Sequence, residues 1–182
     1  MSSSIDFVCL NTTTSTIKQM ADNELFVAAS EDDYVRPMDS RSVITRASIY
    51  NQSNDRNGER GIDLPGVIVT YLGMSGGVSQ GNICHDNRVV RILVQIIDST
   101  DGTDALNLET YFYWRRLIRE WLQANPYDQH TGNTGQVYLV HVTDEPLPEK
   151  ERWVMDRQAQ LHLLVNCHCQ LVRSKEQTPW QP

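Results

Sequence analysis

The sequence lacks several features that common functional classes require. It has no apolar run of about 18 residues, so we expect no transmembrane helix. Residues 1–11, MSSSIDFVCLN, lack the basic and long apolar regions of a signal peptide. With 16 basic and 23 acidic residues the net charge is −7, which makes coating of nucleic acid or binding to anionic membranes unexpected. We find no internal repeat.

Cysteine is scarce and does not follow a metal-binding spacing. The four cysteines are Cys9, Cys84, Cys167 and Cys169, and no Cys-x-x-Cys pair occurs. Reduced thiols in a cytoplasmic setting are the simplest interpretation. The chain has 182 residues, of which 40% are hydrophobic, enough to bury the core of one domain or of one domain with an arm.

The clearest pattern in the sequence is the alternation over residues 160–172, QLHLLVNCHCQLV. Apolar and polar residues alternate with the period of a half-buried strand. This predicts that Cys167 and Cys169 point into the core, while His162 and His168 point the other way. Because one metal ion cannot be bound from opposite faces of a strand, we expect neither a metal site nor another cofactor here.

Further strands and one long helix are predicted around this segment. We expect strands over residues 67–72, 88–97 and 137–142, and a short strand within 43–50. A helix capped by Thr103 or Asp104 should run to about Gln123. At 100° per residue, one of its faces is aromatic and aliphatic. That face comprises Tyr111, Trp114, Ile118, Trp121 and Leu122, with Leu117 at its edge.

These elements predict an α+β fold with a mostly antiparallel sheet, a β-β-α-β-β core and one main helix packed on one face. Residues 1–66 are polar and weakly periodic, and we expect a loop-rich N-terminal arm there, with a short helix over 17–29. Residues 67–173 would form the α+β core domain. Residues 174–182 would be a disordered tail.

Two groups of polar and aromatic residues are candidates for an interface. Arginine and aromatic side chains are enriched at binding hot spots, and the predicted helix carries both on its outer face. A second group lies on the polar face of the predicted sheet, where long strands with one mixed face indicate contact with another subunit. The candidates are Phe112, Arg115, Arg116 and Arg119 on the helix, and Arg91, Gln95 and His168 on the strands.

The sequence offers little support for catalysis. The glycine-rich segment over residues 73–81, GMSGGVSQG, lacks the Gly-Lys-Ser/Thr ending of a phosphate loop and a following helix, and a loop over residues 73–87 is the simpler interpretation. Cys84 and His85 are neighbours, but a nucleophile needs a base that is held by a third group. We therefore expect no catalytic residues and no enzyme activity.

The order of these segments resembles that of the tail-terminator (tail-completion, minor tail protein U-like) proteins of tailed bacteriophages. The segments are LPGVIVTYLG, a glycine-rich loop, RVVRILVQIID, an acidic turn, ALNLETYFYWRRLIREWL and the late alternating strand. The resemblance covers about residues 64–173. It implies an α+β structural virion protein, assembled in the host cytoplasm, that forms a homohexameric ring at the neck end of the tail.

By this resemblance, the ring caps the tail tube, ends its polymerisation and joins the tail to the head-tail connector. Its partners would be other copies of itself, the tail tube protein and the connector or another neck protein. DNA would pass through the lumen without specific binding. The alternatives are another head-tail joining protein, a small enzyme that uses Cys84 with His85 or a distant histidine, and a ligand-binding module.

Overall fold

A computed structural model describes residues 4–23, 40–46, 66–77, 85–99, 104–124, 126–127, 135–144 and 158–172. These ranges contain two α-helices, a short 3-10 helix and one five-stranded sheet. The elements in chain order are α1 (Ile5–Ala21), η1 (Ser40–Ser42), β1 (Val43–Arg46), β2 (Gly66–Gly77), β3 (His85–Ser99), α3 (Asp104–Gln123), β4 (Gly135–Asp144) and β5 (Gln158–Val172).

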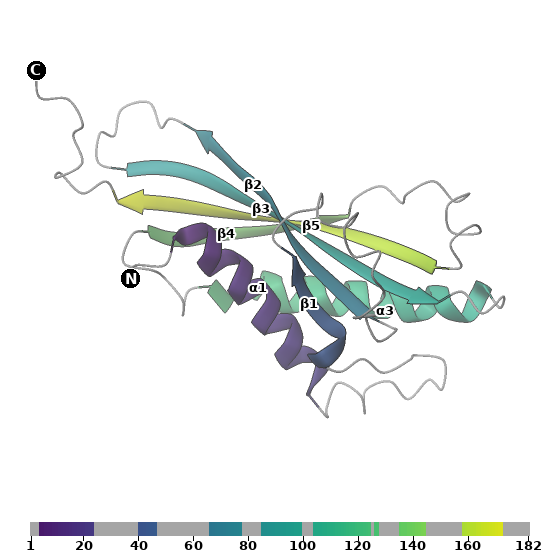
Figure 1. Ribbon diagram of the computed structural model, residues 1–182. Helices are drawn as coiled ribbons and strands as arrows, with labels where there is room; N and C mark the ends of the chain where they lie inside the picture. The colour runs from purple at the N-terminus through teal and green to yellow at the C-terminus, as the bar shows by residue number, and fades with distance from the viewer. Residues whose placement is uncertain are drawn as a thin grey trace, which may run out of the picture.

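The sheet is mixed, with the strand order β1-β2-β3-β5-β4 (Figure 1). β1 pairs with β2 in parallel, and the other three pairings are antiparallel. β5 lies between β3 and β4, so α3 connects two strands that are not neighbours. The α+β class with one sheet is thus as predicted, and the order β2-β3-α3-β4-β5 reproduces the expected β-β-α-β-β series.

The centre of the sheet is the pairing of β3 with β5, which extends from His85 opposite Val172 to Ser99 opposite Gln158. Along both strands, one set of alternating residues belongs to the hydrophobic core. Cys167 and Cys169 are fully buried members of that set, as the alternation predicted, and His168 lies on the other face. The register therefore fixes which side chains reach the core.

Side chains from both helices and from one set of alternating strand residues form a single core cluster. From α3, Trp114, Ile118 and Leu122 are buried, while Leu117 and Trp121 pack against the cluster in part. The predicted phase of this helix is correct at these positions. The side chain of Tyr111 lies outside the described part of the structure.

Helix α1 was not predicted where it occurs. It runs over Ile5–Ala21 and buries Cys9, Ile17 and Met20 in the core, within residues expected to form a loop-rich arm. β1, in the same segment, is the first strand of the sheet. β1 (Val43–Arg46) matches the short strand expected within residues 43–50, whereas α1 was missed, and a helix over residues 17–29 is wrong because α1 ends at Ala21.

A threonine-rich sequence explains why α1 was missed. Threonine has a low helix propensity because branching at Cβ restricts its side chain. In α1, the hydroxyl groups of Thr13 and Thr14 donate to the carbonyl oxygens of Cys9 and Leu10 at 2.8 and 2.9 Å, which satisfies them inside the helix. Packing of the buried face then outweighs the weak local preference.

Strands β2 and β3 are longer than expected. β2 continues through Gly77 and β3 begins at His85, so the loop expected over residues 73–87 is wrong at both ends. β2 passes a bulge between Tyr71 and Gly73, where Gly73 has φ 125°. Glycine adopts this angle without steric cost, so the strand resumes pairing at once with Gly73 opposite Arg91.

Trp114 gives a direct test of the core. Trp114→Ala should lower the free energy of unfolding by about 3–5 kcal/mol, because it removes a large buried ring. Phe112→Ala is the matched control on the same helix, since its ring is 48% exposed, and it should cost less than about 1 kcal/mol. Both values come from urea unfolding followed by circular dichroism. Equal losses in the two variants would contradict the placement of α3.

Candidate functional site

The outer side of α3 carries an exposed group of aromatic and basic side chains. We call Phe112, Arg115, Arg116 and Arg119 the α3 patch. The guanidinium carbon of Arg115 lies 5.0 Å from the centre of the Phe112 ring, and that of Arg116 lies 5.8 Å from the centre of the Tyr113 ring. Both distances allow cation–π attraction, which holds the guanidinium groups against the helix. The structure thus brings the four predicted helix residues together.

Two arginines of the α3 patch are tied to the end of β4. Arg119 donates to Asp144 Oδ1, and an Arg115 nitrogen lies 3.7 Å from Asp144 Oδ2. Arg119 Nε is buried without a hydrogen-bond partner. These contacts attach α3 to the edge strand, so Arg119 and Arg115 have a structural role besides any role in binding.

A second exposed group lies on the sheet face that points away from the core cluster. We call Arg91, Tyr138, Leu139, His141 and His168 the sheet patch. Tyr138 and Leu139 are each 51% exposed, and the Tyr138 ring centre lies 6.2 Å from that of His168. Arg91 and His141 are also exposed. This patch is apolar at its centre and carries one permanent positive charge.

Gln95 is not part of an exposed surface, which corrects the prediction that it belongs to an interface. Its side chain is only 7% exposed, and its Nε2 lies 3.2 Å from Nε2 of His162 on the paired strand. Its neighbours Leu93 and Leu164 are also buried. Among the described residues of this face, Leu93, Gln95 and Leu164 are buried, whereas Tyr138 and Leu139 are exposed.

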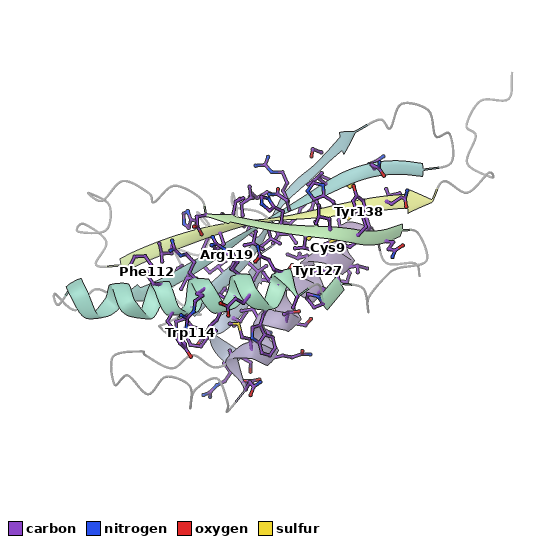
Figure 2. The ribbon with its side chains drawn as sticks, turned by 180° about the vertical axis from the view of Figure 1, so that it is seen from behind. Cys9, Phe112, Trp114, Arg119, Tyr127 and Tyr138 are labelled. Carbon is purple, nitrogen blue, oxygen red and sulfur yellow. The ribbon has the colours of Figure 1, made fainter. Side chains whose placement is uncertain are left out.

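The predicted interface residues therefore fall into separate groups on different elements. In Figure 2, Phe112 on α3 and Tyr138 on β4 lie toward opposite ends of the molecule. Arg91 and His168 lie near each other, because their strands pair with Arg91 opposite Asn166 and Val89 opposite His168. One continuous surface containing all seven predicted residues is not formed.

The exposure of Tyr138 and Leu139 escaped the sequence analysis, although a signal for it exists. In VYLVHV, Val137 is in phase with Leu139, whereas Val140 and Val142 have the opposite phase. Val137, Val140 and Val142 are all buried, which requires one extra residue between them. β4 contains this irregularity between Val137 and Leu139, and two consecutive apolar side chains are left outside.

Buried thiol and hydroxyl groups form a polar cluster inside the core. Cys9 Sγ of α1 lies 3.8 Å from Cys169 Sγ of β5, and Cys167 is nearby on the same strand face (Figure 2 labels Cys9 and Tyr127). Thr13 donates its only hydroxyl proton to the carbonyl of Cys9, so Tyr127 must be the donor in the 2.6 Å contact between their hydroxyl oxygens. These contacts link α1, β5 and the residues that follow α3.

The thiols of Cys9 and Cys169 do not have the character of nucleophiles. A hydrogen bond with Cys167 and then burial raise the pKa of Cys9 above its ordinary value of 9.0. A hydrogen bond with Cys9 and then burial raise the pKa of Cys169. A reactive cysteine needs the opposite, an accessible thiol with a lowered pKa. Cys84, the candidate nucleophile of the enzyme alternative, lies outside the described residues.

Within the described ranges, no three histidine, cysteine, aspartate or glutamate side chains are placed to share one metal ion. Neither α1 nor α3 is long and apolar enough to cross a bilayer, and no other helix in the described part of the chain is. No protein-family model matches the sequence, and no curated protein matches it significantly.

The raised thiol pKa values predict a loss of stability at alkaline pH. Above about pH 9 the unfolded chain releases thiol protons that the folded chain retains, so the free energy of unfolding should fall as the pH rises. The slope is at most about 1.4 kcal/mol per pH unit for each thiol. Urea unfolding in a reducing buffer between pH 7 and pH 10.5 measures it.

Cys9→Ala is the control for this prediction. It removes one titrating group, so its stability should decrease less steeply above pH 9 than that of the unaltered chain. Identical slopes for the two proteins would contradict the assigned role of the Cys9 thiol.

Proposed function

We propose that this chain is a structural protein of a tailed-phage virion that caps the tail tube as a ring. In this role it ends tube polymerisation and joins the tail to the head-neck connector. The proposal combines the resemblance of the sequence to tail-terminator proteins with the surface of the fold. Its partners are further copies of the chain, the tube protein and a neck protein.

The observation that carries the proposal is the sheet patch. Tyr138 and Leu139 are adjacent, half-exposed apolar side chains beside the His168 ring. Large apolar groups that adjoin one another on a surface are typical of protein contact sites, and aromatic residues are enriched there. A protein that assembles with several partners needs such surfaces, and the α3 patch offers a second one.

The order of the elements supports the same proposal. The resemblance rests on two strands, an acidic turn, one long amphipathic helix and a late alternating strand. β2, β3, α3 and β5 have this order and this character, and β4 precedes β5. The acidic balance of the chain, at −7, suits a ring that DNA must pass through without sticking.

The experiment is the mass of the purified chain by light scattering coupled to size exclusion, with and without tube protein. We expect six subunits of 20.8 kDa, about 125 kDa, either alone or after tube protein is added. Binding to immobilised tube protein in preference to portal protein distinguishes a terminator from another neck protein. A 20.8 kDa monomer under both conditions would refute the ring.

A further inference from the structure

Two buried thiols that are far apart in the sequence lie next to each other in the core. Cys9 belongs to α1 and Cys169 to β5, and their sulfur atoms are 3.8 Å apart. Both side chains are fully buried, and both cysteines are free. Cys169 Sγ also donates to the carbonyl oxygen of Cys167 at 3.3 Å, which holds this sulfur in place. The packing of the first helix on the last strand thus keeps two thiols together.

Only a small movement separates this contact from a covalent bond. The sulfurs of a disulfide are about 2.0 Å apart, so the two atoms must approach by roughly 1.8 Å. Rotation about the Cα–Cβ bonds moves the sulfurs and leaves the backbone in place. The competing partner for Cys9 is Cys167, which lies on the same face of β5 and also forms a hydrogen bond with Cys9. The direct contact of 3.8 Å favours Cys169.

We propose that Cys9 and Cys169 form a reversible disulfide in oxidising surroundings, and that this bond fastens α1 to β5. A small disulfide such as oxidised glutathione is the oxidant. One cysteine thiolate attacks it, which forms a mixed disulfide and releases one glutathione thiolate. The other cysteine thiolate then attacks the protein sulfur of the mixed disulfide and releases the second glutathione. Two electrons pass to glutathione, and the two cysteine protons end on the released thiols.

The surroundings of the pair determine when this reaction takes place. The thiolate is the attacking species, and hydrogen bonds to neighbouring thiols, followed by burial, raise the pKa of both cysteines. The closed core therefore resists oxidation, and the oxidant reaches the thiols while α1 is separated from the sheet, as it is during folding. Once formed, the bond is buried, so a reductant also reaches it slowly.

The bond would join two distant parts of the chain and stabilise the existing fold. The two cysteines are 160 residues apart in the sequence. A crosslink over such a separation removes many conformations from the unfolded chain and thereby favours the folded one. The oxidised chain then has the same fold as the reduced chain but a higher stability. Because both cysteines belong to one subunit, this bond does not depend on the proposed ring.

Refolding in a glutathione buffer tests the proposal. The full chain is unfolded in urea, refolded with a mixture of reduced and oxidised glutathione, alkylated, and mapped by tandem mass spectrometry of its peptides. We expect a crosslink between Cys9 and Cys169 in more than half of the chains. Their melting temperature should be about 5–15 °C higher than that of the chain refolded with dithiothreitol. Reduction of the bond in urea, followed by refolding with dithiothreitol, should restore the lower value.

Cys167→Ala is the matched control for Cys169→Ala, because both positions are fully buried on the same face of β5. Cys167→Ala should retain the crosslink and the rise in melting temperature, whereas Cys169→Ala should lose both. Cys84→Ala removes the fourth thiol and should behave like the unaltered chain.

Three results would overturn the proposal. The first is a chain whose Cys9 stays reduced in an excess of oxidised glutathione, and the second is a crosslink from Cys9 to Cys167 or Cys84 instead. The third is a bond between Cys9 and Cys169 that lowers the melting temperature, because the folded structure would then not accommodate it. The peptide map of the unaltered chain identifies the partner of Cys9 even if Cys169→Ala does not fold.

Discussion

The rest of the structure depends on the register between β3 and β5. These strands pair from His85 opposite Val172 to Ser99 opposite Gln158, and side chains alternate between faces along both. A shift by one residue would exchange the faces and put His168 in the core in place of Cys167. The helices, the thiol cluster and the sheet patch all occupy positions that this register fixes. This register is more stable than one shifted by a residue, because it buries Val90, Ile92, Val94 and Ile96 opposite their β5 partners.

The elements that could be predicted are those with a strong period and an unambiguous length. The alternation in β5 predicts one core-facing set of strand residues, and the aromatic stripe of α3 predicts one core-facing side of the helix. The buried positions Cys167, Cys169, Trp114 and Ile118 follow from these two predictions. α1 could not be predicted, because Thr13 and its neighbours favour a helix only after their hydroxyl groups bond to the preceding turn and their faces pack. Tertiary contacts, which a local pattern does not contain, decided that segment.

The candidate site was predictable only in part for a similar reason. The four residues of the α3 patch follow from helix geometry, and they do come together. Gln95 has the right phase for the outer sheet face, but phase does not determine whether other parts of the chain cover a position. Tyr138 required the recognition of a phase conflict between Val137 and Val140. The proposed function depends on exposed surfaces such as the one around Tyr138. Strand periodicity predicts which face of a sheet a side chain lies on, but it does not predict whether that side chain is exposed.

The position of β5 between β3 and β4 has a consequence for biosynthesis. β5 follows β4 in the sequence, yet it is the strand with which both β3 and β4 pair among the described strands. Until β5 leaves the ribosome, β4 lacks its partner and the inner edge of β3 is open. During translation the nascent chain therefore presents unpaired strand edges of the kind that favour aggregation. Among the described strands, the one that joins β4 to the rest of the sheet is therefore the last to be made.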